Sequence, residues 1–153
     1  MMAVVQRVSH ARVEVNRELI SGIDGGLLIL LGISAEDSHG ESEWLARKIA
    51  RLRIFSDSEG KMNLSMVDLG LDALVVSQFT LFGDASQGNR PSFIQAARPE
   101  KAIPLYEDFC HQLGLCLNKE VKRGIFGADM QISLLNDGPV TLVLDTKAIM
   151  KKT

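Results

Sequence analysis

Apolar residues fall in short runs along the first third of the chain, and turn-forming residues separate these runs. Residues 3–15 are rich in valine and partly alternate, and residues 19–23 form a second short run. Residues 27–33 are continuously apolar, which is typical of a strand buried on both faces. The pattern predicts three strands, and Asp24-Gly25-Gly26 predicts a hairpin turn between the second and the third.

Two later segments carry apolar residues at helical spacing and predict helices that pack against a core. The first follows Asp37 or Ser38, either of which can cap a helix. Pro99 suits the first turn of the second helix, and Gly114 is expected to end it. The two apolar stripes consist of Trp44, Leu45, Ile49 and Leu52, and of Ile103, Tyr106, Cys110 and Leu113.

The remaining apolar runs predict strands at residues 73–79, 115–121, 130–136 and 140–145. Many strands with two main helices between them indicate an α+β fold rather than an alternating βαβ fold. A β-barrel-like antiparallel or mixed sheet would protect the strand edges. The length of 153 residues fits one domain, which we assign to residues 1–146, with residues 147–153 as a C-terminal tail.

The charge balance limits the partners that the chain can bind. Its net charge is -2 and its pI is about 5.9, whereas a protein that grips long nucleic-acid backbones usually has a clear basic excess. Contact with RNA is therefore expected to be local, weak or confined to one end of the molecule. Three basic clusters exist, interpreted first as solvated faces: Arg47, Lys48, Arg51 and Arg53; Lys119, Lys122 and Arg123; Lys147, Lys151 and Lys152.

Several familiar kinds of site are missing from the sequence. It has no P-loop, no dinucleotide-binding glycine pattern and no HExxH motif. Cys110 and Cys116 are too few for a disulfide scaffold and have no metal-ligand spacing with a histidine, so we expect neither a metal nor a cofactor. No secretion signal or membrane-spanning run is found, which favours the reducing cytoplasm. Residue spacing alone leaves a Ser-His-Asp triad open.

Two segments could carry chemistry. Ser77-Gln78-Phe79-Thr80 places hydroxyl and amide groups at the end of an apolar strand, where they could bind a carbonyl, an amine or a water. They could equally satisfy local backbone groups, which is the better interpretation from composition alone.

The second segment contains Gly138-Pro139, and spacing alone favours a hairpin turn there. A ligand can nevertheless approach a glycine backbone closely, and the bond before proline can be cis at a cost of about 0.5–1 kcal/mol. A cis Gly-Pro would direct both carbonyls in similar directions, so that they could accept hydrogen bonds from an ammonium group.

The sequence resembles the D-aminoacyl-tRNA deacylase family over nearly its whole length. SQFTL at Ser77 to Leu81 and NDGPVT at Asn136 to Thr141 are similar to the two signature motifs of that family. Six further stretches are similar in the family's order: AVVQRVSHARVEV, GLLILLGI, WLARKIARLRIF, GKMNLS, RPSF and FGADMQISLL. Each motif alone is weak, but together they are specific.

This resemblance implies a β-barrel-like fold in a homodimer, with an active site at the subunit interface. It implies that Gly138 and Pro139 of one subunit recognise the substrate's α-amino group beside Ser77, Gln78, Phe79 and Thr80 of the other. Met130 is expected near the Gly-Pro loop, and Arg7 is expected to hold that loop.

The implied substrate is the ester that joins a D-amino acid to the 3′ end of tRNA, with glycyl-tRNA cleaved as well. Thr80 has no basic neighbour in the sequence, so attack by water is favoured over a covalent threonine, with backbone N–H groups near Phe79 and Thr80 as oxyanion donors. Two alternatives stay open. One is a nucleic-acid-binding or scaffold protein that shares the fold without deacylation. The other is a related editing enzyme with a trans Gly-Pro and relaxed chirality.

Overall fold

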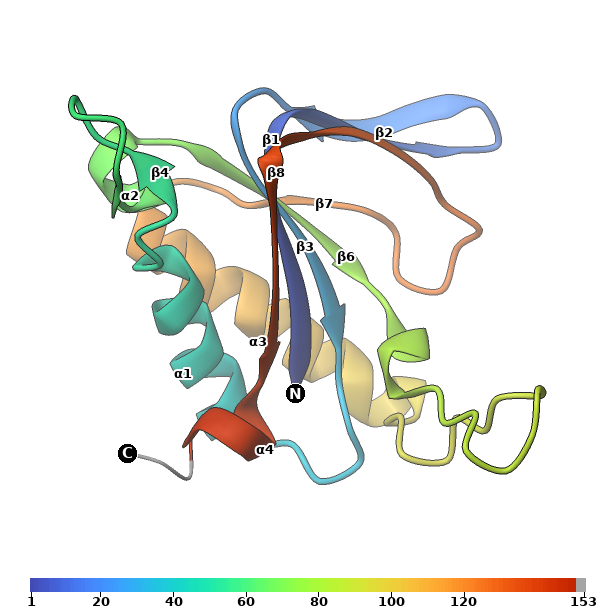
Figure 1. The fold of residues 1–153 in the computed structure, drawn as a ribbon. Helices are drawn as coiled ribbons and strands as arrows, with labels where there is room; N and C mark the ends of the chain where they lie inside the picture. The colour runs from blue at the N-terminus through green and yellow to red at the C-terminus, as the bar shows by residue number, and fades with distance from the viewer. Residues whose placement is uncertain (151–153) are drawn as a thin grey trace.

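A strongly curved mixed sheet forms the centre of the protein, and two helices cover one of its faces (Figure 1). The structure is a computed structural model that describes residues 1–150. Its strands are β1 (Met2–Val15), β2 (Glu18–Ile23), β3 (Gly26–Gly32), β4 (Phe55–Ser56), β5 (Met62–Leu64), β6 (Asp72–Ser77), β7 (Lys122–Arg123) and β8 (Gln131–Asp145). Its helices are α1 (His39–Ala50), α2 (Met66–Leu69), the 3-10 turn η1 (Phe79–Phe82), α3 (Pro99–Leu117) and α4 (Thr146–Ile149). The α+β, barrel-like expectation is confirmed.

The long strand β1 organises the sheet. Along one edge it pairs with β8 in antiparallel fashion, and along the other it pairs with β2 and β3. Strand β3 pairs in parallel with β6, and β6 pairs in parallel with β7. Helix α1 lies in the connection from β3 to β6, and α3 lies in the connection from β6 to β7. Both helices cover the same face of the sheet, where they pack side by side.

The predicted hairpin at Asp24-Gly25-Gly26 is wrong. Ala11 pairs with Ile23, and Val8 pairs with Gly26 in the same register. β2 and β3 therefore lie end to end along one edge of β1 and do not pair with each other. Gly26 is needed for close approach instead, because a Cβ there would lie 1.9 Å from the Asp72 carbonyl oxygen of β6.

Local signals explain where the two main helices begin. Ser38 caps α1 in a capping box with Glu41, and its hydrogen bonds hold the pKa of Glu41 below the ordinary value. Pro99 lies in the first turn of α3, as predicted. Gly114 does not end this helix, because the turn continues to Leu117 and Asn118 then adopts the left-handed conformation at φ 53°. Part of the strand predicted at residues 115–121 is therefore helix.

Two apolar cores hold the layers together. The larger one lies between the sheet and the helices and includes Val5, Ile29, Leu45, Phe109 and Leu113. Ile103 is 37% exposed, so its predicted place on the buried stripe of α3 is wrong, and Leu105 is buried instead. The smaller core lies on the other face of the sheet, around Val8, Leu28 and Leu74.

The C-terminal end is more ordered than a tail. Residues Thr146–Ile149 form α4, which Asp145 caps through its side chain. Thr146 is buried and donates its hydroxyl and its N–H to the Met1 carbonyl. Residues 151–153 of the predicted tail lie outside the described part of the chain. No helix within residues 1–150 is both long and apolar enough to cross a membrane.

Candidate active site

The strand-end motif is exposed at the carboxyl end of β6, at the lower right in Figure 1. β6 ends at Ser77, and the Gln78 N–H donates to the Leu31 carbonyl at 2.8 Å before the chain enters η1. The side chains of Ser77 and Gln78 are half-buried, whereas Phe79 and Thr80 are exposed. Phe79 packs edge-on against Phe93 with ring centroids 5.1 Å apart. The motif thus forms one wall of an open site.

The hydroxyl of Thr80 has no base beside it. The Gln78 side-chain amide donates a hydrogen bond to this hydroxyl. An amide cannot take a proton at neutral pH, and within residues 1–150 no ionisable group is hydrogen-bonded to Thr80. The first N–H groups of a 3-10 turn have no partner inside the turn, so those of Phe79 and Thr80 are not used within η1. This geometry offers donors rather than an activated nucleophile.

Gly138 and Pro139 lie in a bulge of β8, not in a hairpin turn. Both halves of β8 pair with β1, since Val8 pairs with Asn136 and Gln6 with Thr141. Residues 137–139 are the exposed tip between these pairs, and the Gly138-Pro139 peptide bond is cis. The hairpin interpretation and the trans alternative are therefore both wrong for this chain.

Arg7 fixes the bulge from beneath. Its Nε donates to the Asp137 carbonyl at 3.1 Å, and it also lies 3.5 Å from the Asp137 carboxylate. Its Nη1 donates to the Ile54 carbonyl at 2.7 Å, and its side chain is only 12% exposed. A second brace comes from Asn136, whose side chain accepts from the Val140 N–H and donates to Thr141. These contacts place Arg7 directly against the Gly-Pro loop.

Within one chain the two motifs are far apart. Arg7, beside the bulge, pairs with Leu27 on β3, which pairs with Ala73 on β6. The three strand spacings from β8 to β6 amount to roughly 14 Å, and the four residues from Ala73 to Ser77 add roughly 13 Å along the strand. The two motifs therefore do not come together within a single chain.

Met130 also lies away from the Gly-Pro loop of its own chain. It immediately precedes β8, and the neighbouring Gln131 pairs with Glu14 at the far end of β1. The strand from Gln131 to Asn136 spans roughly 17 Å. Met130 packs against Gly124 and the smaller core. The expected neighbourhood of Met130 and Gly138 is thus wrong within one subunit.

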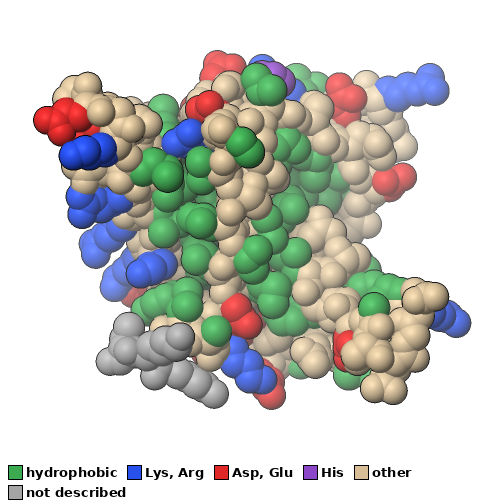
Figure 2. Space-filling model, in the orientation of Figure 1, with side chains coloured by type: hydrophobic (Ala, Val, Ile, Leu, Met, Phe, Trp, Pro, Cys, Tyr) green, Lys and Arg blue, Asp and Glu red, His purple; other side chains and the backbone are tan. Residues whose placement is uncertain are grey.

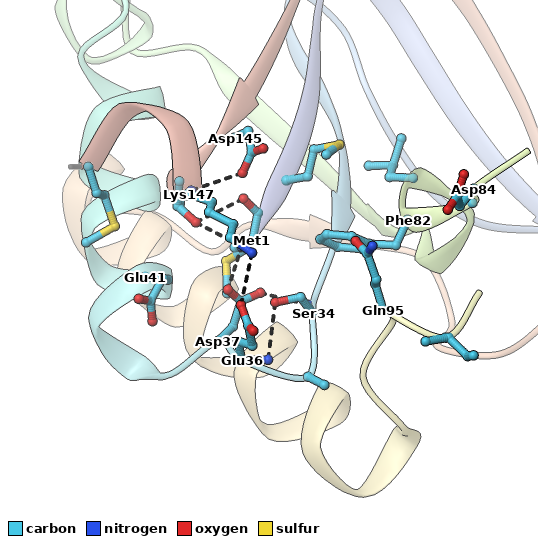
Figure 3. A pocket seen from close by; sticks show the side chains of 17 residues that line it. Met1, Ser34, Glu36, Asp37, Glu41, Phe82, Asp84, Gln95, Asp145 and Lys147 are labelled. Carbon is cyan, nitrogen blue, oxygen red and sulfur yellow. Dashed lines mark hydrogen bonds and ion pairs between the residues drawn. The ribbon is translucent and has the colours of Figure 1, made fainter. Parts of the chain in front are cut away.

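Sequence reasoning missed a cleft of about 890 Å³ beside η1. Figure 3 shows Phe82 and Asp84 on one side of it and Asp37, Asp145 and Lys147 on the other. Between them the Met1 amine is buried and donates to Asp37 at 2.6 Å and to the Thr146 hydroxyl at 2.8 Å. None of the eight predicted site residues lines this cleft. No sequence motif marks it, because its walls come from five separated segments.

A cluster of Ser, His and Asp does occur, but it is not a catalytic triad. The His39 Nδ1 lies 3.1 Å from Asp108, and Ser42 donates its hydroxyl to the same carboxylate. Burial opposes ionisation of Asp108, yet the hydrogen bonds from Ser42, His39 and Gln112 outweigh it and hold the pKa of Asp108 below its ordinary value. Ser42 is buried and contacts the acid, not the imidazole, so it has no general base. Its role is to join α1 to α3.

Comparison with known proteins identifies a family. The family model described as D-Tyr-tRNA(Tyr) deacylase matches residues 4–145. A D-aminoacyl-tRNA deacylase of Cytophaga hutchinsonii is 56% identical over 147 residues, which cover 96% of this chain and 98% of that protein. A protein of the same name from Porphyromonas gingivalis is 56% identical over 146 residues, 95% of this chain and 97% of that protein.

Two solved structures have the same fold. One is named c-Myc DNA Unwinding Element Binding Protein and superposes with a TM-score of 0.90 at 46% identity, covering 95% of this chain and 98% of that one. The other is described as a probable eukaryotic D-amino acid tRNA deacylase, with a TM-score of 0.79 at 17% identity over 94% of this chain and 97% of that one, which shows the fold alone. With the match to the family model and the two relatives at 56% identity, these likenesses establish that the chain belongs to the D-Tyr-tRNA(Tyr) deacylase family.

Proposed function

We propose that this protein hydrolyses the ester bond of D-aminoacyl-tRNA and so releases the D-amino acid and free tRNA. The single observation that carries this proposal is the match of residues 4–145 to the deacylase family, with both signature motifs present and with Phe79, Thr80 and residues 137–139 exposed. Glycyl-tRNA is a further substrate. The reaction takes place in the cytoplasm, where aminoacyl-tRNA is made and used. A nucleic-acid-binding or scaffold role without deacylation is less well supported, because the relatives at 56% identity are named deacylases.

The active enzyme is a homodimer with two cross-subunit sites. One support is the separation of the two motifs within a chain. The other is an apolar surface on the sheet face opposite α1 and α3, toward the viewer in Figure 2. Val143, 66% exposed, pairs with Val4, which pairs with Leu30, so three strands contribute one apolar row. In the proposed dimer a two-fold axis passes through this face, and the Gly-Pro loop of each chain lies against the η1 end of the other.

Each motif has its own task in the composite site. The Gly138 and Pro139 carbonyls accept hydrogen bonds from the substrate's α-ammonium group, and Arg7 keeps the loop in place. Ser77, Gln78, Phe79 and Thr80 of the partner subunit line the pocket, and Met130 of the partner contributes to its wall. Glycine at position 138 is needed for the loop to pack on Arg7, because a Cβ there would lie 2.7 Å from the Arg7 guanidinium.

The hydrolysis needs positioning more than a strong nucleophile, because an aminoacyl ester is already activated. Water attacks the ester carbonyl, and the terminal ribose hydroxyl of the substrate assists. The N–H groups of Phe79 and Thr80 bind the oxyanion as it forms. Holding the ammonium and the carbonyl at fixed points supplies the remaining acceleration through orientation.

Chirality follows from these two fixed points. The ammonium is held by the Gly-Pro carbonyls and the ester carbonyl by the η1 N–H groups. The directions of the two remaining substituents of the α-carbon, the hydrogen and the side chain, are then fixed. An L side chain points into backbone and is rejected, whereas a D side chain points outward and meets no specific pocket. The site therefore accepts many D side chains and cannot reject glycine.

The test is hydrolysis of D-Tyr-tRNA, L-Tyr-tRNA and a second D-aminoacyl-tRNA by the purified protein. Efficient release from both D substrates, with L-Tyr-tRNA left intact, is the expected result. Comparable cleavage of the L substrate, or strict selectivity for one D side chain, would contradict the chiral account. Binding of tRNA without any cleavage would favour the nucleic-acid-binding alternative.

A further inference from the structure

Four cations with no acidic residue among them follow each other at the end of α1. Arg47, Lys48, Arg51 and Arg53, here called the basic flank, are all exposed. Arg47 and Lys48 precede Arg51 by four and three residues, so these three share one face of the helix. Figure 2 shows Lys and Arg side chains gathered at the left edge, over α1 and the β4–β5 hairpin. The chain carries a net charge of -2, so the charge of this surface is opposite in sign to the net charge of the protein.

The needs of the fold explain only part of the basic flank. Cations in the last turn suit the helix dipole, Arg47 pairs with Glu43 at 2.6 Å, and Lys48 lies 6.0 Å from the Trp44 ring. Arg51 is the C-cap residue and Arg53 lies beyond the helix. Within residues 1–150, neither Lys48 nor Arg51 takes part in an ion pair. Lys48, Arg51 and Arg53 thus keep charge available for a partner.

The basic flank is joined to the Gly-Pro loop by one side chain. Arg7 donates to the Asp137 carbonyl in the loop and to the Ile54 carbonyl, which directly follows Arg53. Arg53 is in turn oriented by its Nε, which donates to the Asn63 carbonyl at 2.9 Å, and its side chain is exposed. Arg7 therefore ties the backbone next to the basic flank to the Gly-Pro loop.

We infer that the basic flank binds backbone phosphates of the tRNA acceptor end while the terminal ester lies in the site. This inference rests on the proposed function. When the Gly-Pro loop of one chain enters the pocket of its partner, the basic flank of the first chain lies at the rim of that pocket. The RNA strand that leaves the pocket then passes Lys48, Arg51 and Arg53, whose positive charges attract the negative phosphates. A local contact of this kind is compatible with an acidic protein, because a few phosphates suffice.

The experiment compares a long and a short substrate. The double variant Lys48→Gln/Arg51→Gln is assayed on D-Tyr-tRNA and on 3′-O-D-tyrosyl-adenosine, which has the same ester without phosphates. The matched control is Arg17→Gln/Lys122→Gln, which removes the same charge from exposed positions in the β1–β2 turn and on β7. None of these four residues belongs to the proposed catalytic site.

For D-Tyr-tRNA, we expect KM of the flank variant to rise on the order of tenfold at low salt. The slope of log(kcat/KM) against log salt should become shallower by about 1.5, while the adenosine ester is cleaved as before and the control matches wild type. An unchanged KM for D-Tyr-tRNA, or an equal loss on both substrates, would overturn the inference.

A second measurement separates this inference from the proposed function. Uncharged tRNA is titrated against wild type and the flank variant, with duplex DNA of equal charge as competitor. If wild type cleaves neither ester, the proposed function fails, but weaker and less salt-dependent tRNA binding by the variant still supports the flank. Equal tRNA binding by both proteins, or equal preference for the duplex DNA, overturns it.

Discussion

Replacing Gly138 by alanine should disable the site while leaving the fold intact. Gly138 has a φ of 125°, a region that alanine rarely adopts, and a Cβ there would lie 2.7 Å from the Arg7 Nη2 and 3.0 Å from a Val140 methyl. The backbone strain alone costs about 1–3 kcal/mol. The Arg7 guanidinium, which bonds to Asp137 and Ile54, must also move or the loop must lift away from it.

The magnitude follows from what the loop is proposed to do. A shift of about 1 Å in a positioning group can cost on the order of 100-fold in rate, so kcat/KM for D-Tyr-tRNA should fall by about that factor. The melting temperature should fall by roughly 2–12 °C, as expected for about 1–3 kcal/mol in a domain of this size. The assay is single-turnover release of D-tyrosine, with thermal unfolding measured on the same samples.

Gly127→Ala is the matched control. Gly127 also has a positive φ, 78°, but nothing lies within 4 Å of a Cβ there. It should therefore share the strain cost and keep full activity. Wild-type kcat/KM in the Gly138→Ala variant would refute the assignment of the loop carbonyls to the substrate ammonium.

Three further predictions follow from the geometry. Thr80→Ala should retain kcat for D-Tyr-tRNA within about tenfold, because within residues 1–150 that hydroxyl is hydrogen-bonded to the Gln78 amide and to no base. Complete loss of turnover would favour a covalent threonine. Val143→Asp should shift the protein from dimer to monomer in sedimentation experiments and abolish hydrolysis, because it would bury a charge in the apolar row. An active monomer would contradict the shared site. Because the pKa of Asp108 is lowered in the folded state, its contribution to stability is present above the unfolded pKa and is lost as pH falls through the folded value. Urea unfolding of Asp108→Asn should therefore show a weaker acid dependence than wild type below about pH 4, and identical pH profiles would contradict the Ser42–Asp108–His39 contact.

Local signals in the sequence predicted the elements well wherever one residue decides the outcome. Ser38 with Glu41 forms the predicted helix start, and Pro99 opens α3. The helix end predicted at Gly114 was wrong. A glycine can lie inside a helix when the following residues, here Leu115 to Leu117, continue it, and Asn118 takes the left-handed end position instead.

Pairing over long sequence distances could not be predicted from local patterns. Asp24-Gly25-Gly26 and Gly138-Pro139 both have turn chemistry, yet in each case the chain continues along β1. What decides is the length of β1, which pairs with three strands. The same limit applies to the site: family resemblance named Arg7 and Gly138, but only the register shows why Arg7 reaches Asp137 and why Met130 does not approach Gly138.

The most direct test of a site shared between two chains is complementation between inactive variants. Gly138→Ala spoils the loop, and Thr80→Trp fills the pocket with an indole ring. In a mixed dimer one site combines both defects, while the other combines the intact loop of one chain with the intact pocket of its partner.

Equal amounts of the two variants should be unfolded together, refolded and assayed on D-Tyr-tRNA. With random pairing, half of the dimers are mixed and each has one intact site, so activity should return to about a quarter of the wild-type value. Activity no higher than that of either variant alone would contradict a site built from two subunits.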